Sequence, residues 1–195
     1  MRDRIGIFGG SFDPVHNGHI SVIKSFLNSN LLDRVSVMLT PYPPHKKSDL
    51  QTSYQHRLNM LEIAVKNLEN VSISDLETRL PQPSYTLQTI NYLKEIEPDN
   101  LFFLCIGEDS IVNFNKWYHF EEILEKVTLV VAERPGFNKR RADPKILERT
   151  IFVEHKPVDI SSTEIRENES GKNENAVPAE VEMYIQKHSL YSHTN

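Results

Sequence analysis

The two histidines of the N-terminal segment Gly9–His19 lie three residues apart, directly after a glycine-rich turn. The segment reads Gly-Gly-Ser-Phe-Asp-Pro-Val-His-Asn-Gly-His and follows the apolar run Ile5–Phe8. Glycines let a backbone turn tightly and approach a ligand, and a helix beginning here offers unpaired N–H groups and the positive end of its dipole. At this spacing His16 and His19 can present both rings to one bound group. The combination favours a phosphate-containing ligand.

Three other interpretations of this segment fit its residues less well. It lacks the G-x-G-x-x-G spacing of a dinucleotide fingerprint and the GK[ST] of a Walker loop. A His-x-x-His pair can bind zinc, although no thiol and no H-E-x-x-H context accompanies it here. Helix capping by Asp13 or Asn17 would explain neither histidine.

A second polar segment, Ile160–Arg166, reads Ile-Ser-Ser-Thr-Glu-Ile-Arg. Ser161, Ser162 and Thr163 are predicted to open a helix, where hydroxyls and free N–H groups can face a bound anion. Arg166, one turn further, supplies a planar fork of donors for phosphate oxygens. Taken alone, the segment is equally well explained as a helix N-cap.

Together the two segments resemble the nucleotidyltransferase superfamily that carries a His-x-Gly-His motif, and they occur in the expected order about 140 residues apart. The resemblance implies that these motifs grip the triphosphate of ATP. The implied catalytic residues are His16, His19 and Arg166. The implied ATP-binding residues also include Gly9, Gly10, Ser11, Phe12, Ser161, Ser162 and Thr163.

Further short segments are similar to one family, the bacterial nicotinate-nucleotide adenylyltransferases. They are Pro43-Pro44-His45-Lys46, Ser84-Tyr85-Thr86, Gly107-Glu108-Asp109, Lys116-Trp117-Tyr118 and Arg134-Pro135-Gly136. Each tripeptide is a weak signal, whereas their ordered succession is strong. With the two motifs, the resemblance spans residues 4 to 190.

The resemblance places the nicotinate ring near Trp117, the chain's one tryptophan, whose flat indole suits stacking. Without this resemblance, the favoured interpretation of Trp117 is an ordinary core aromatic residue. The carboxylate of the ring is expected to meet donors around Tyr85, Thr86 and Tyr118, because a carboxylate offers only acceptors.

Four more residues are expected to contact the two substrates. Lys46 and Arg134 are expected to reach a phosphate of the mononucleotide, although lysines and arginines in loops are often simply solvated. Gly107 permits close approach of the ATP nucleotide, and Asp109 can accept hydrogen bonds from a ribose hydroxyl or a metal-bound water.

One departure from the family pattern concerns Gln88. Members often carry an acid there, in the form Ser-Tyr-Thr-x-Asp-Thr, whereas this chain has glutamine. Glutamine retains hydrogen-bonding capacity but loses the charge, which leaves any capping or ribose role of that acid open.

The reaction implied by the resemblance is transfer of AMP from ATP to nicotinate mononucleotide, giving deamido-NAD and pyrophosphate. The attacking phosphate oxygen is already ionised, so donors that align two anions matter more than a general base. Mg²⁺ is expected to arrive on the ATP phosphates rather than in a protein cage.

Alternative functions remain open from the sequence. Nicotinamide mononucleotide or phosphopantetheine could replace the acid substrate, and a non-catalytic nucleotide sensor could share the fold. The basic triplet Lys139–Arg141 is a poor nucleic-acid signal in a chain of net charge −5. No nucleic-acid partner is expected, and a homo-oligomer is left open.

Composition and periodicity indicate the framework. The chain has 195 residues, one cysteine (Cys105, inside an apolar run) and no apolar stretch near the ~20 residues that span a bilayer. We therefore expect a cytoplasmic protein without membrane contact, and one nucleotidyltransferase domain over residues 1–195.

Six short apolar runs alternate with segments of helical period, which predicts an α/β fold with a doubly wound, mostly parallel, Rossmann-like sheet. The predicted strands are Ile5–Phe8, Val35–Thr40, Val71–Leu76, Leu101–Gly107, Thr128–Ala132 and Ile151–Glu154. Predicted helix starts include a capping box at Thr52–Gln55 and a cap at Ser84, with a C-terminal helix over about 178–188. Phe137–Pro144 and Asn168–Asn175 are expected to be loops. In such sheets ligands bind beyond the carboxyl ends of the strands.

Overall fold

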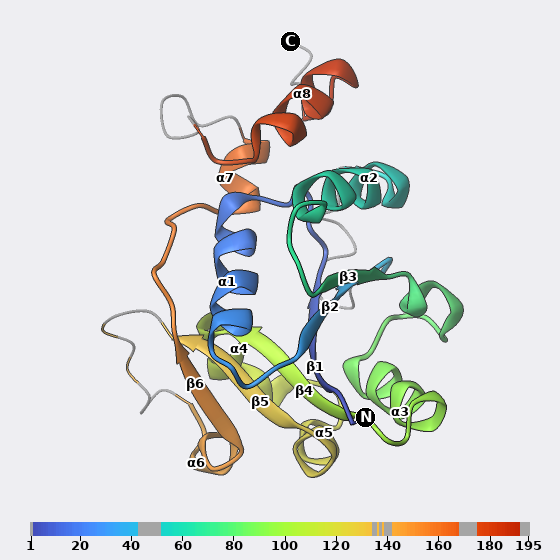
Figure 1. Ribbon diagram of the computed structural model, residues 1–195, viewed down its shortest axis with the longest axis vertical. Coiled ribbons are helices and arrows are strands. Elements are labelled where there is room, and N and C mark those ends of the chain that lie inside the picture. The colour runs from blue at the N-terminus through green and yellow to red at the C-terminus, as the bar shows by residue number, and fades with distance from the viewer. Residues whose placement is uncertain are drawn as a thin grey trace.

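The computed structural model describes residues 2–42, 52–133, 136, 138, 142–167 and 175–191. Its centre is one six-stranded sheet, ordered β3-β2-β1-β4-β5-β6, in which every neighbouring pair is parallel (Figure 1). The strands are β1 (Arg4–Gly10), β2 (Arg34–Leu39), β3 (Val71–Ser74), β4 (Leu101–Gly107), β5 (Thr128–Glu133) and β6 (Thr150–Glu154). The predicted doubly wound α/β architecture is confirmed.

Helices and short 3-10 turns connect the strands. The helices are α1 (Asn17–Asn28), α2 (Tyr54–Val65), α3 (Thr86–Ile96), α4 (Glu108–Val112), α5 (Phe120–Lys126), α6 (Pro144–Leu147), α7 (Ser162–Arg166) and α8 (Ala179–Lys187). The 3-10 turns are η1 (Leu76–Arg79) and η2 (Phe114–Lys116). Because η1 begins at Leu76, the predicted third strand ends two residues too late.

Alternating side chains of each central strand enter two separate cores. In β4, Leu104 and Ile106 join a core formed with α3 and α5, while Cys105 joins the core formed with α1, α2 and α8. Burial on both faces explains why the strands are almost continuously apolar. Burial also raises the pKa of the Cys105 thiol, as expected for a cysteine that acts as a small apolar side chain.

Two predicted helix caps are wrong in detail. Ser53, not Thr52, caps α2, and its hydroxyl accepts from the N–H of His56 at 3.3 Å. Ser84 lies one residue before the N-cap of α3, and its hydroxyl donates instead to Oε1 of Gln82 at 2.9 Å. At α2 the acceptor is thus one position further along than expected, whereas the N-cap of α3, Tyr85, makes no side-chain cap hydrogen bond.

The order of the sheet fixes where a ligand can bind. Strands β1 and β4 are adjacent at the centre, and chain order reverses between them, so their carboxyl ends flank the crevice typical of this architecture. Figure 1 shows α7 and α8 beside the N-terminal end of α1, above that edge. No described helix is long and apolar enough to cross a membrane.

Two glycines of β1 differ in what surrounds them. A Cβ on Gly6 would lie 2.6 Å from Cδ1 of Leu32 and 2.8 Å from Sγ of Cys105, whereas a Cβ on Gly9 would meet nothing within 4 Å. Protein packing therefore explains Gly6, and it does not explain Gly9.

Gly6→Ala should lower the free energy of unfolding by about 1–3 kcal/mol, because it overpacks a filled core. Gly9→Ala should leave that free energy nearly unchanged. Urea unfolding of the two variants beside the unmodified chain measures both effects, and equal destabilisation would contradict the difference in packing.

Candidate active site

His16 and His19 cap α1 reciprocally. The N–H of His16 donates to Nδ1 of His19 at 3.2 Å, and the N–H of His19 donates to Nδ1 of His16 at 3.4 Å. The two rings are stacked, with centroids 3.7 Å apart. Because each Nδ1 is an acceptor, the proton of each neutral ring is assigned to Nε2. The cap thus converts both histidines into Nε2–H donors.

His16 is buried, with 6% of its surface exposed. Burial lowers its pKa to about 4, and the nearby Glu164 carboxylate offsets this only in part. His16 is therefore neutral near pH 7 and acts as a hydrogen-bond donor rather than a cation. Gly18 makes room for it, since a Cβ there would lie 2.9 Å from Nδ1 of His16.

Asp13 and Asn17, the alternative candidates for capping α1, have other partners. Asn17 donates from Nδ2 to the carbonyl of Asn175 at 2.6 Å, and the carboxylate of Asp13 accepts from the hydroxyl of Tyr191 at 2.6 Å. Phe12 is 1% exposed, and its ring packs edge-on against His19 with centroids 5.0 Å apart. Its side chain supports the histidine pair, which leaves the backbone of Phe12 as the part able to face a ligand.

The N-terminal loop and α7 are in direct contact although they are far apart in sequence. Oγ of Ser162 donates to the carbonyl of Pro14 at 3.0 Å, and Nη1 of Arg166 donates to the carbonyl of Asp13 at 2.9 Å. Nη2 of Arg166 also donates to Oγ1 of Thr163 at 3.3 Å. The structure therefore brings together the two motifs that the sequence singled out.

Ser161 has a capping role in the structure. Its Oγ accepts from the N–H of Glu164 at 3.2 Å, while the Glu164 carboxylate accepts from the N–H of Ser161 at 2.9 Å. This is a capping box, which holds the first turn of α7 against the loop.

Sequence reasoning missed Arg57, an arginine on α2 that is 1% exposed. Its Nη1 donates to the carbonyls of Ser11 at 2.7 Å and Thr40 at 3.0 Å, and Nη2 donates to the carbonyl of Pro41 at 3.3 Å. Arg57 thus joins the loop after β1 to the end of β2. Because it is an isolated basic residue in a helical pattern, the sequence contains no signal for this role.

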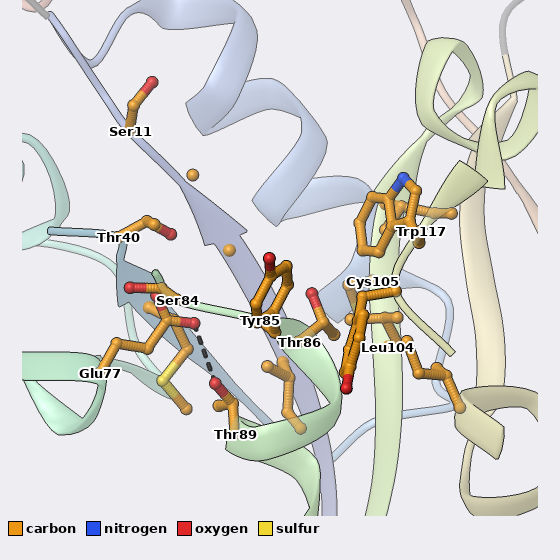
Figure 2. A pocket seen from close by; sticks show the side chains of 17 residues that line it. Ser11, Thr40, Glu77, Ser84, Tyr85, Thr86, Thr89, Leu104, Cys105 and Trp117 are labelled. Atoms are coloured by element: carbon orange, nitrogen blue, oxygen red, sulfur yellow. Dashed lines mark hydrogen bonds between the residues drawn. The ribbon is translucent and has the colours of Figure 1, made fainter. Parts of the chain in front are cut away.

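A cavity of about 240 Å³ opens beside the glycine turn (Figure 2). Gly9, Gly10 and Ser11 line it from β1 and the following loop, whereas Tyr85, Thr86, Trp117 and Tyr118 line it from α3 and the segment after η2. Residues predicted for the two substrates therefore share one cavity.

The aromatic residues of this cavity pack in two pairs. Trp117 packs against the core residue Phe114, with centroids 4.9 Å apart, and also faces the cavity. Tyr85 and Tyr118 are stacked with centroids 4.5 Å apart. Trp117 is therefore both a core aromatic residue and part of the cavity wall, and its stacking on a pyridine ring stays a prediction.

Two polar side chains hold the start of α3. Oε1 of Gln88 accepts from the N–H of Tyr85 at 3.4 Å, so glutamine keeps a capping contact at this position.

Glu77, which the sequence did not single out, lines the cavity with 6% of its surface exposed. Its Oε1 accepts from Oγ1 of Thr89 at 3.0 Å, and burial raises its pKa despite nearby hydroxyls.

The remaining predicted residues are more scattered. A Cβ on Gly107, at the end of β4, would meet nothing within 4 Å. Asp109 is exposed on α4 and does not line the cavity. Lys46, Arg134 and the triplet Lys139–Arg141 lie outside the described residues.

The donor set suits an anion better than a metal ion held by the protein. Among the described residues there is no group of three or more His, Cys, Asp and Glu side chains that could hold a metal. Imidazole N–H, guanidinium, hydroxyl and helix N–H groups dominate the site instead.

Comparison with known proteins agrees with this geometry. The family model described as cytidylyltransferase-like matches residues 7–168. A probable nicotinate-nucleotide adenylyltransferase of Clostridium tetani is 34% identical, covering 95% of this chain and 97% of its own length. The nicotinate-nucleotide adenylyltransferase of Bacillus subtilis is also 34% identical, covering 96% and 98%.

Solved structures resemble the fold over its whole length. Plasmodium falciparum nicotinic acid mononucleotide adenylyltransferase complexed with NaAD aligns with a TM-score of 0.81 at 25% identity, covering 97% of this chain and 98% of that one. The same enzyme complexed with APC aligns with a TM-score of 0.80.

The pKa of His16 predicts how stability depends on pH. Between about pH 6.5 and pH 4 the unfolded chain binds a proton at His16 that the folded chain does not. The free energy of unfolding should therefore fall as the pH drops through this range, by up to about 3 kcal/mol from this residue. Urea unfolding at a series of pH values measures it.

His16→Asn should flatten this pH dependence, whereas His119→Asn, at an exposed histidine in the left-handed region, should not. An unchanged slope in His16→Asn would mean that His16 titrates normally in the folded chain.

Proposed function

The chain belongs to the cytidylyltransferase-like family, and within it to the nicotinate-nucleotide adenylyltransferases, so we propose that it transfers AMP from ATP to nicotinate mononucleotide. The products are deamido-NAD and pyrophosphate, which makes the reaction a step of NAD biosynthesis. The observation that carries the proposal is the contact between the Gly9–His19 segment and α7, in a segment whose Gly9, Gly10 and Ser11 also line the aromatic-walled cavity.

The triphosphate of ATP lies, in this proposal, between the N-terminal loop and α7. In this arrangement His16 and His19 would offer Nε2–H donors, and the backbone N–H groups at the start of α7 would donate to the same phosphates. Gly9 and Gly107 support this placement, because the open space beside them is not filled by protein side chains.

Nicotinate mononucleotide occupies the cavity, with its ring against Trp117. Its carboxylate accepts hydrogen bonds from donors at the first turn of α3, around Tyr85 and Thr86, and from the Tyr118 segment. Predicted phosphate contacts of Lys46 and Arg134 complete this hypothesis for the mononucleotide. Asp109 is assigned to ATP instead, where it would accept from a ribose hydroxyl or a metal-bound water.

The chemistry requires alignment more than proton transfer. A phosphate oxygen of the mononucleotide attacks the α-phosphorus of ATP in line, and pyrophosphate leaves. Because two anions must meet, fixed donors that neutralise charge on the phosphate oxygens lower the barrier. A neutral His16 suits this role, since its N–H donates without exchanging a proton with the substrate.

Nucleotidyltransferases of this kind generally use a divalent metal ion. We propose Mg²⁺, held by ATP phosphates and waters, because the described part of the site offers anion donors rather than a carboxylate cage. The ion would supply additional charge neutralisation at the phosphates.

Pyrophosphate release from ATP, measured with nicotinate mononucleotide and with nicotinamide mononucleotide in parallel, tests the proposal. The acid should be the better substrate by kcat/KM. Faster reaction with the amide would reassign the substrate, and ATP binding without any pyrophosphate release would indicate a nucleotide sensor.

His19→Ala should lower kcat by about 100-fold or more, comparable with removal of an oxyanion donor. Steady-state kinetics with both substrates saturating measures the effect, and a thermal melt checks that the variant is folded. Turnover close to that of the unmodified chain would remove His19 from the catalytic residues.

Trp117→Ala should raise KM for the mononucleotide by roughly tenfold, because the stacking surface is lost, and should leave KM for ATP nearly unchanged. Trp117→Phe retains an aromatic face and should restore most of the affinity. An effect confined to ATP would refute this placement of the pyridine ring.

A further inference from the structure

The Asp13 carboxylate is buried in the loop that leads to the histidine pair. Asp13 is 1% exposed, and it lies in the turn that precedes His16 by three residues. Its Oδ1 accepts from the hydroxyl of Tyr191 at 2.6 Å, across 178 positions of sequence. A buried carboxylate requires such donors, because it is costly to remove its charge from water without them.

Tyr191 follows α8 and approaches the loop from outside the sheet. The N–H of Leu190, the residue before Tyr191, donates to the carbonyl of Ile185 at 3.0 Å. This bond holds Leu190 against the end of α8. Tyr191 itself has a φ of 59°, in the left-handed region that tyrosine rarely adopts. The side chain thus reaches Asp13 from a defined backbone position.

The Tyr191 hydroxyl remains a donor under all ordinary conditions. Burial and the Asp13 carboxylate both raise its pKa, while the hydroxyl of Thr52 contacts it as well. The Tyr191 hydroxyl is therefore protonated at neutral pH and donates to Asp13.

The other anchors of this loop hold different atoms. Arg57, Arg166 and Ser162 donate to backbone carbonyls, of Ser11, Asp13 and Pro14 respectively. The Tyr191 contact differs because it holds a side chain. Loss of this bond would remove a short hydrogen bond from the buried Asp13 carboxylate and loosen the turn that leads to His16.

We propose that Tyr191 is a positioning residue of the ATP site, which acts through Asp13 to fix the loop that carries His16 and His19. This rests on the proposed function, in which that loop binds the triphosphate. The C-terminal segment is then part of the active-site framework as well as a packing element.

Tyr191→Phe removes only the hydroxyl and tests the proposal. Calorimetric binding of α,β-methylene-ATP should weaken by about tenfold, the usual effect of losing a hydrogen bond to a charged group. KM for ATP should rise correspondingly, whereas KM for the mononucleotide should stay nearly constant. A merely structural role would alter the two constants together or neither.

Tyr184→Phe is the matched control on α8. Its hydroxyl contacts Nδ1 of His56 at 2.9 Å and Nδ2 of Asn59 at 2.7 Å, both on α2. This variant should bind the ATP analogue like the unmodified chain. Equal weakening in both variants would attribute the effect to docking of α8 and overturn the proposal.

A double-mutant cycle with Asp13→Asn isolates the contact. In the Asp13→Asn background, Tyr191→Phe should weaken binding much less than it does in the unmodified chain. Additive effects, or unchanged binding in Tyr191→Phe, would overturn the proposal. If the unmodified chain itself fails to bind the analogue, the proposed function fails first, which distinguishes the two failures.

Discussion

The hydrogen bond from Arg166 to the carbonyl of Asp13 joins two parts of the chain separated by 153 positions. With the neighbouring bond from Ser162 to Pro14, it sets the hydroxyl-rich start of α7 against the loop that ends in the histidine pair. Neither segment alone surrounds a phosphate chain. The proposed site depends on the carbonyl of Asp13, in the loop, being held by the side chain of Arg166, in α7.

Buried charge gives this site its rigidity. Asp13 and Arg57 are each 1% exposed, and the Asp13 carboxylate is close enough to favour the charged form of Arg57. Such groups are stable only with nearly complete sets of partners, so each fixes the backbone around it. The reciprocal cap of His16 and His19 extends this order to the two imidazole rings, because it assigns the proton of each ring to Nε2.

How much of the structure the sequence could predict depends on how far apart in the chain the interacting residues lie. The apolar strands are a local pattern, and the sheet was predicted correctly from them. The two polar motifs are local patterns too, and the structure brings them into contact, while their binding of ATP stays a prediction. Arg57, Glu77 and Tyr191 act through contacts between distant elements, and nothing local marks an isolated arginine or tyrosine for such a role. The cap of α2 was misplaced because the adjacent hydroxyl of Ser53 accepts the free N–H of His56. The cap of α3 was misplaced because the helix begins one residue later, where Gln88 contacts the N–H of Tyr85.

A crystal structure of the chain with α,β-methylene-ATP and nicotinate mononucleotide tests most directly whether the Gly9–His19 segment and α7 bind the same triphosphate. The triphosphate oxygens should lie within hydrogen-bond distance of Nε2 of His16 and His19 and, at the same time, of donors from α7, with the pyridine ring on Trp117. A triphosphate that contacts only one of the two motifs, or binds at another edge of the sheet, would contradict the account.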